Sequence, residues 1–344
     1  MRIVRVTNFY GSPSAALSPT IRELGAGYLR AGHEFVVVSA GATYSTRFTS
    51  YATLITVPWH RSSGRRASLV DLVSAVRLLL DDLRPDRLEV ADRLTLRSLG
   101  AWAVTNAVPA VAVLDDEPSP WVLRAVGAAG YQHVVVSTGQ GVVDAAAHSL
   151  PHALRVPHGV DLEEFNPLRW SGEVSRDLRD GAEILVVLAT GRDSPRDTGV
   201  VTSAMRELLR RGIDAQLVGL QDGMSSRDRA TVLASADVFI ALGTPSTVVL
   251  EALEALASGT PVVAPAGTPA AELTVGDAGT GAALGPDGLA DAVGRVLGIR
   301  VEDRRTAARA AASAFPWSTT VEDMLALHNE VDESPLTELV VPIG

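Results

Sequence analysis

The stretch from residue 236 to 264 constrains the fold more than any other part of the chain. The apolar run 238–240 fits a short strand buried on both faces. Ser246 or Thr247 can cap a following helix, whose apolar positions recur at helical spacing. Gly259 stands where helices commonly end, and a second apolar run comes directly after it. The stretch therefore predicts a β-α-β unit with a ligand-facing loop at the carboxyl edge of a parallel sheet, a unit that many α/β folds share.

Strand and helix patterns alternate along the rest of the chain. Such alternation is typical of parallel sheets with right-handed crossovers, so the fold class is α/β. The expected strands are 2–9, 34–39, 88–90, 108–114, 131–137, 153–156, 183–189 and 215–219. Expected helices start after the cap Ser18-Pro19 and cover 69–83, 198 to about 211, 227–234, 288–297 and 301–314, with a last one after 315. A basic loop is expected at 61–67.

The length of 344 residues suits two domains of ordinary size. We place the boundary in the polar segment 169–181, because the stretch just before it carries turn residues at both ends. The expected parts are a first domain at 1–168, a second at 169–314, and a C-terminal helix and tail at 315–344.

The amino-acid composition limits the classes of partner that this chain is expected to bind. The net charge of −10 argues against nucleic acid, and no apolar run is long enough for a transmembrane segment. The chain contains no Lys, so a phosphate held by a side-chain cation must be held by Arg. With no Cys, and with a strand starting at residue 2 rather than a signal peptide, we expect a cytoplasmic protein. The histidines lack metal-ligand spacing, so no metal is expected, and a homodimer is left open.

Four segments together resemble glycosyltransferase family 4. The run 246–264 is similar to the family's nucleotide-sugar signature, 157–167 to its interdomain segment, and 29–34 to its entry into the second strand. The run 92–102 also resembles actinobacterial members related to mannosyltransferases. The resemblance implies the GT-B fold: two facing Rossmann-like domains, with the helix after 315 returning to the first. It further implies a retaining transfer of a sugar from a nucleotide, with GDP favoured.

The family resemblance assigns a phosphate clamp to the loop that carries Gly191, Arg192 and Arg196. A leaving nucleoside diphosphate develops negative charge, which cations, backbone N–H groups or helix N-termini must stabilise. Arg192 matches the family's Arg, whereas the family's Lys position falls on Asp197. Arg196 is adjacent and can substitute for that Lys. The alternative is that both arginines are solvated loop charges.

The signature itself is only partly kept. Glu254 stands at the family's second carboxylate, which accepts hydrogen bonds from ribose hydroxyls, and Glu251 lies one helical turn earlier. The first carboxylate, which contacts the transferred sugar, falls on Ser246, followed by Thr247. These four residues complete the predicted donor-binding set, with surface charge as the alternative for Glu251.

The first domain departs from the family at two positions. The phosphate-contacting Gly-Gly loop falls on Ala15 and Ala16, where methyl groups hinder close backbone approach. The catalytic His position falls on Asp115, which can act as a base or belong to a solvated acidic loop. Asp92 and Arg93 are placed on the acceptor side by the resemblance.

Two functions remain open from the sequence. The first is a retaining glycosyltransferase that uses a GDP-linked and unusual sugar, a small-molecule acceptor and no metal, as in secondary-metabolite biosynthesis. The second is a pseudo-glycosyltransferase that kept the fold as a binding or partner-activating module, because Ser246, Asp197, Ala15-Ala16 and Asp115 all depart together.

Overall fold

A computed structural model describes residues 1–7, 18–59, 65–114, 119–150, 153–189, 195–221, 223–242, 245–283 and 285–333. The chain divides into two compact units. The first consists of Met1–Ser137, Gly141–Val156 and Ser318–Gly344, and the second of Thr138–Gln140 and Pro157–Trp317. The predicted α/β class is confirmed, and each unit is built on its own sheet.

The first unit has an eight-stranded sheet in the order β3-β4-β2-β1-β5-β6-β7-β8. All neighbours are parallel except β3, which runs antiparallel to β4 at one edge. The strands are β1 (Arg2–Val6), β2 (Glu34–Gly41), β3 (Ser45–Phe48), β4 (Thr53–Pro58), β5 (Arg87–Val90), β6 (Ala110–Leu114), β7 (His133–Val136) and β8 (Ala153–Arg155). The short apolar runs of the sequence thus form the buried centre of a parallel sheet, and β3 and β4 lie between the second and third expected strands.

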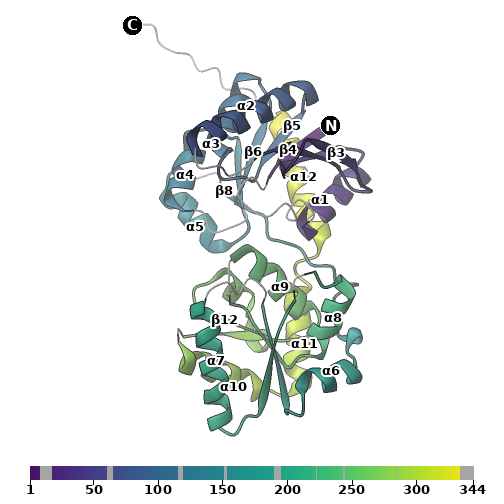
Figure 1. Cartoon of the computed structure of the whole chain (residues 1–344), viewed down its shortest axis with the longest axis vertical. Coiled ribbons are helices and arrows are strands. Elements are labelled where there is room, and N and C mark those ends of the chain that lie inside the picture. The colour runs from purple at the N-terminus through teal and green to yellow at the C-terminus, as the bar shows by residue number, and fades with distance from the viewer. Residues whose placement is uncertain are drawn as a thin grey trace. The chain divides into compact units, whose positions relative to one another are not determined.

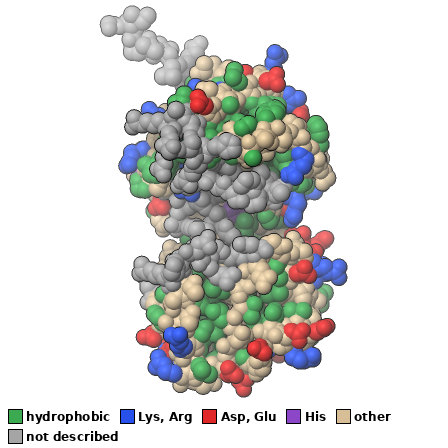
Figure 2. All heavy atoms as spheres, viewed as in Figure 1, with side chains coloured by type: hydrophobic (Ala, Val, Ile, Leu, Met, Phe, Trp, Pro, Cys, Tyr) green, Lys and Arg blue, Asp and Glu red, His purple; other side chains and the backbone are tan. Residues whose placement is uncertain are grey.

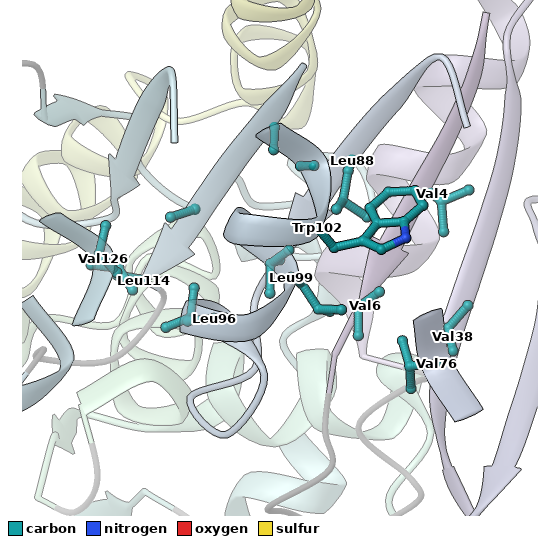
Figure 3. Close-up of a cluster of buried hydrophobic side chains, with 14 of the residues drawn as sticks. Val4, Val6, Val38, Val76, Leu88, Leu96, Leu99, Trp102, Leu114 and Val126 are labelled. Carbon is teal, nitrogen blue, oxygen red and sulfur yellow. The ribbon is translucent and has the colours of Figure 1, made fainter. Parts of the chain in front are cut away.

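Helices cover both faces of this sheet (Figure 1). One face packs against α2 (Arg65–Leu83), α3 (Leu96–Thr105), α4 (Pro120–Gly127) and α5 (Gly139–Ala147), and the other packs against α1 (Pro19–Arg30) and α12 (Trp317–Glu333). Figure 3 shows the first of these cores, in which Trp102 of α3 lies beside Leu88 of β5 and Val4 of β1. The two layers leave the central strands fully buried.

The second unit has a five-stranded parallel sheet in the order β10-β9-β11-β12-β13. Its strands are β9 (Ile184–Leu188), β10 (Ala215–Gly219), β11 (Val238–Ile240), β12 (Val262–Pro265) and β13 (Gly279–Ala282). Helices α7 (Pro195–Arg210) and α10 (Pro286–Leu297) pack on one face. Helices α6 (Gly172–Arg179), α8 (Ser226–Ser235), α9 (Pro245–Ala257) and α11 (Val301–Ala312) belong to the other side. On the face seen in Figure 2, charged side chains of both signs lie mainly around the rim of this unit.

The β-α-β unit predicted at 236–264 is confirmed as β11, α9 and β12. Gly259 has a φ of +78°, a left-handed conformation that glycine adopts without strain. Its N–H bonds to the carbonyl of Leu256, and the next N–H, of Thr260, bonds to the carbonyl of Ala255, the pattern of a Schellman motif. The expected cap is different: α9 already begins at Pro245, so Ser246 and Thr247 lie in its first turn.

The boundary between the units falls earlier than the expected one. Residues 157–168, expected in a first domain of 1–168, belong to the second compact unit. The physical reason is burial: Val160 and Phe165 belong to the second unit's core. The N–H of Val160 also bonds to the carbonyl of Phe315.

Helices α2 and α7 begin earlier than predicted, so the expected loop before each of them is shorter. Helix α2 starts at Arg65 rather than at 69, so the basic loop expected at 61–67 ends sooner. Helix α7 starts at Pro195, a favoured first helical residue, rather than at 198. Residues 8–9 of the first expected strand lie outside the described residues, and the remaining expected helices and strands are found within a few residues of their predicted ends.

The last helix, α12, joins the first unit. Its apolar residues Val321, Met324 and Leu327 lie in the same core as α1 and β2. This part of the expectation for 315–344 agrees with the structure, although Phe315 to Trp317 still belong to the second unit.

Candidate functional site

The candidate site is built on α9 of the second unit. In a parallel sheet the helix that follows a strand begins at the carboxyl edge, where open α/β sheets bind ligands. Helix α9 begins five residues after β11 ends, and most of its described apolar side chains are fully buried. The helix is therefore a fixed support for the two carboxylates that it carries.

These two carboxylates, Glu251 and Glu254, meet one guanidinium. Arg229 of α8 places Nη1 3.2 Å from Oε2 of Glu254 and 3.8 Å from Oε1 of Glu251. Glu251 is 1% exposed and Glu254 is 8% exposed. The three side chains form a cluster that we call the Glu-Arg-Glu cluster, and it is largely removed from water.

The position of the cluster along α9 raises the cost of its negative charge. Glu254 lies in the last turn of the helix, where the backbone carbonyls carry partial negative charge. No basic residue of α9 itself stands in that turn. Arg229 supplies the compensating charge from the neighbouring helix, which explains why an acidic pair is tolerated there.

The C-terminal end of α9 is held by two arginines of α11. Arg309 donates hydrogen bonds from Nη1 to the carbonyls of Ala257 and Phe165, and from Nη2 to that of Leu162. Arg305 donates to the carbonyls of Ala234, Ala236 and Ser258. Since the last carbonyls of a helix lack partners within it, these guanidinium groups satisfy and fix the ends of both α8 and α9.

Several predicted site residues lie outside the described residues: Ala15, Ala16, Asp115, Gly191 and Arg192. Arg196 lies in the first turn of α7, and Ser246 and Thr247 lie in the first turn of α9. Their backbones are described but their side chains are not. The predicted contacts of these eight residues with a donor therefore stay predictions.

Asp92 has a local role that the sequence did not reveal. It follows β5, is buried, and accepts hydrogen bonds on Oδ1 from the N–H groups of Leu94 and Thr95. Its carboxylate thus closes the turn that leads into α3. Arg93 is exposed on the same turn. The acceptor-side role of both residues stays a prediction.

A second group of polar residues was not anticipated. In the first unit, Glu89 of β5 accepts hydrogen bonds from Arg5 at 2.9 Å and from the hydroxyl of Tyr28 at 2.7 Å, and its Oε1 lies 2.8 Å from Nε2 of His328. We call these four residues the Glu89 network. A signal was present in the sequence, because Arg5 and Glu89 each stand between two apolar residues of a strand. The histidine gave no signal.

The Glu89 network is closed to ligands, since Glu89 and His328 are both 0% exposed. Burial alone raises the pKa of the Glu89 carboxyl, but the hydrogen bond from His328 and the charge of Arg5 outweigh burial and lower the pKa to about 2. Burial and the neighbouring carboxylate raise the pKa of Tyr28 well above its usual value, so its hydroxyl stays a donor. The network is therefore a structural element rather than a binding site.

Among the described residues no three His, Cys, Asp or Glu side chains lie close enough together to hold a metal ion. Within the same residues we find no helix of the length and apolarity that crossing a bilayer requires. The described chemistry of the candidate site thus consists of carboxylates, arginines and backbone groups.

Comparison with solved structures defines the class of the protein. It is similar to a sucrose-phosphate synthase from Thermosynechococcus elongatus, with a TM-score of 0.74, 14% identity, and coverage of 97% of this chain and 100% of that one. A glycosyltransferase from Rickettsia africae gives a TM-score of 0.73 at 13% identity, covering 97% and 99% of the two chains. Anabaena HepE in complex with UDP gives 0.68 at 15% identity, covering 96% and 100%. The fold is that of GT-B glycosyltransferases.

Sequence comparison then defines the family. Residues 173–298 match the model described as glycosyl transferases group 1. Over 95% of its length the chain is 32% identical to a GDP-mannose-dependent alpha-(1-6)-phosphatidylinositol dimannoside mannosyltransferase of Mycobacterium tuberculosis, and the match covers 95% of that relative. The chain belongs to the family 4 glycosyltransferases, as the sequence signature predicted.

Proposed function

We propose that this glycosyltransferase transfers a sugar from a GDP-linked donor, with retention of configuration, to a small-molecule acceptor. The main support for a nucleotide-sugar donor is the position of Glu254. This carboxylate, at the family's ribose-binding position, is held by Arg229 at 3.2 Å and is 8% exposed. A carboxylate held in place by an arginine is a strong acceptor for two vicinal ribose hydroxyls.

The choice of GDP rests on the relative from Mycobacterium tuberculosis, which is GDP-mannose-dependent. The transferred sugar is proposed to be unusual, because Ser246 replaces the family carboxylate that contacts it. A hydroxyl in place of a carboxylate makes fewer and weaker hydrogen bonds to sugar hydroxyls. This difference supports a role in secondary metabolism rather than transfer of mannose itself.

Departure of the nucleoside diphosphate from the sugar requires positive charge beside the β-phosphate. Arg192 and Arg196 are proposed to provide it, together with the N-terminus of α7, which begins at Pro195. Asp115 is proposed as the residue near the reacting centre of the first domain, with Ala15 and Ala16 in the phosphate loop. No metal is needed in this proposal. A homodimer and a cytoplasmic location also stay predictions from the sequence.

The experiment that tests the proposed function is calorimetric titration of the purified full chain with GDP, UDP and ADP. We expect GDP to bind most tightly. Hydrolysis of GDP-mannose and of GDP-linked deoxy- or amino-sugars is then followed, with the modified sugars expected to turn over faster. Absence of binding by every nucleotide at millimolar concentration contradicts the proposal. Nucleotide binding without turnover of any donor indicates a pseudo-glycosyltransferase instead.

A further inference from the structure

We infer that Arg229 and Glu251 are positioning residues, which hold the Glu254 carboxylate so that it accepts hydrogen bonds from the ribose hydroxyls of a nucleoside diphosphate. The inference rests on the proposed function and deepens it. It divides the Glu-Arg-Glu cluster by role: Glu254 contacts the ligand, Arg229 contacts Glu254, and Glu251 contacts Arg229.

The division of roles follows from burial. Glu254 stands at the family's ribose-binding position and is 8% exposed, whereas Glu251 is 1% exposed. A side chain that is almost wholly buried meets its protein neighbours and not a ligand. Glu251 was expected among the donor-binding residues, and its burial points to an indirect role through the guanidinium of Arg229.

The geometry of α9 makes this indirect role effective. Residues three apart on a helix lie on the same face, so Glu251 and Glu254 project toward α8 together. Two carboxylates in such proximity repel each other unless a cation stands between them. The Nη1 atom of Arg229 lies within 4 Å of both, 3.8 Å from Glu251 and 3.2 Å from Glu254.

The guanidinium of Arg229 is also chemically suited to bridging Glu251 and Glu254. A guanidinium is planar, carries five N–H donors in a fixed plane and stays charged, so it can bind two carboxylates at once. Its charge offsets the unfavourable position of Glu254 in the last turn of α9. Without it, the two carboxylates repel each other and Glu254 loses the hydrogen bond that fixes its Oε2 atom.

The test compares binding of GDP with binding of 2′,3′-dideoxy-GDP, which lacks the two ribose hydroxyls. The variants are Glu254→Ala, Arg229→Met, Arg229→Lys and Glu251→Gln in the full chain. The matched control is Arg227→Met, because Arg227 is exposed on the same helix two residues away. The measured quantity is the ratio of the two dissociation constants, with the melting temperature of each variant as a check of folding.

We expect wild type and Arg227→Met to favour GDP by about tenfold or more, as one to two hydrogen bonds to a charged group allow. In Glu254→Ala and Arg229→Met the ratio falls to near one, while the affinity for dideoxy-GDP stays within about threefold. Arg229→Lys is expected to keep part of the wild-type ratio of dissociation constants. Glu251→Gln is expected to lower that ratio, but less than Arg229→Met does. The double variant Arg229→Met/Glu254→Ala behaves as Glu254→Ala alone.

The outcomes separate this inference from the proposed function. Wild type that fails to bind GDP, or that binds both nucleotides equally, contradicts the donor assignment itself. A ratio that collapses in Glu254→Ala but is kept in both Arg229 variants and in Glu251→Gln overturns only the positioning roles. A loss of affinity for dideoxy-GDP in Arg229→Met that persists in the double variant shows that Arg229 contacts the nucleotide directly. Should Arg229→Met not fold, Arg229→Lys and Glu251→Gln decide.

Discussion

Arg5 and Glu89 lie opposite each other on the adjacent parallel strands β1 and β5, with Nη1 of Arg5 2.9 Å from Oε2 of Glu89. Both side chains are buried at the centre of the first sheet, and Tyr28 of α1 and His328 of α12 reach the same carboxylate. A buried ion pair of this kind is strongly destabilised when one partner is removed, because the other is left without compensation. The network therefore connects the two central strands to the two helices that cover one face.

Because of Glu89, the free energy of unfolding of the chain should fall as the pH becomes acidic. The pKa of Glu89 is about 2 in the folded protein, against 4.5 as the ordinary value. A lowered pKa contributes stability that is present above 4.5 and is lost as the pH falls toward 2, in total about 3 kcal/mol. We expect the free energy of unfolding of wild type to fall by about 2 kcal/mol more than that of Glu89→Gln between pH 6 and pH 3, measured by urea unfolding.

The control for this pH dependence is Glu330→Gln, because Glu330 is exposed on α12, the helix that also carries His328. Its pH profile should follow that of wild type. Equal slopes for wild type and Glu89→Gln between pH 6 and pH 3 would show that the carboxyl titrates normally in the folded state.

A glycine sets the contact between α1 and α12. A Cβ atom added at Gly27 would lie 2.4 Å from Cγ1 of Val321, well inside contact distance. Gly27→Ala should therefore lower the free energy of unfolding by about 1–3 kcal/mol through overpacking, despite the better helix propensity of alanine. Adding Val321→Ala should recover most of this loss, as thermal or urea unfolding can measure.

Gly199 provides the comparison, since a Cβ atom there meets nothing within 4 Å and the residue lies in helix α7. Gly199→Ala is expected to stabilise the chain by about 0.5–1 kcal/mol. If Gly27→Ala stabilised the chain by a similar amount, the close packing of α12 on α1 would be wrong.

Arg309 of α11, which is half-buried, stabilises the second unit through backbone carbonyls. Arg309 donates to three carbonyls, those of Leu162, Phe165 and Ala257, and so connects α9 to the segment that enters the unit. Loss of hydrogen bonds from a charged donor to buried acceptors costs more than loss of a surface pair. We expect Arg309→Met to lower the free energy of unfolding by about 3 kcal/mol, measured by urea unfolding.

Arg300→Met is the matched substitution at the N-cap of the same helix, because Arg300 forms an exposed pair with Asp303. Exposed pairs of this kind contribute about 0–1 kcal/mol. Comparable losses in the two variants would mean that the carbonyl contacts of Arg309 add nothing beyond an ordinary surface charge.

The sequence predicted the β-α-β unit around 236–264 well because its signals are local. An apolar run, a helical period and a glycine at the C′ position each act within a few residues, and Gly259 adopts the expected left-handed backbone. The Glu89 network could not be predicted in the same way. It joins residues 5, 28, 89 and 328, and only the strand order and the return of α12 bring them together.

The candidate site shows the same contrast. Glu254 is assigned to the candidate site because it belongs to a continuous signature, whereas Arg229 stands 25 residues earlier in a helix whose pattern gives no hint of its partner. The domain boundary was misplaced by 12 residues for a related reason. Polar composition marks 169–181 as a surface segment, but burial of Val160 and Phe165 decides which unit the preceding stretch joins.

Glu254 should contribute directly to nucleotide affinity if it accepts hydrogen bonds from the ribose. We expect Glu254→Ala to weaken GDP binding by about 1–3 kcal/mol, measured by calorimetry. Glu302→Ala, an exposed carboxylate at the start of α11, should leave binding unchanged. Unchanged GDP binding in Glu254→Ala would remove this residue from the donor site.

We assign stabilisation of the charge that develops on the donor's leaving diphosphate to arginines and a helix N-terminus rather than to a metal. Since preorganised donors aimed at a developing charge contribute up to about 10²–10³ in rate, Arg192→Met should lower kcat by about 10²-fold. Arg227→Met, a loss of one exposed charge on α8, should leave kcat within about twofold of wild type, which separates a specific contact from a change in net charge. Treatment with EDTA should likewise leave turnover of the GDP-sugar within about twofold. Activity that is abolished by EDTA and restored by Mg²⁺ or Mn²⁺ would instead assign the charge to a bound cation, and the arginine clamp would then have only a secondary part in departure.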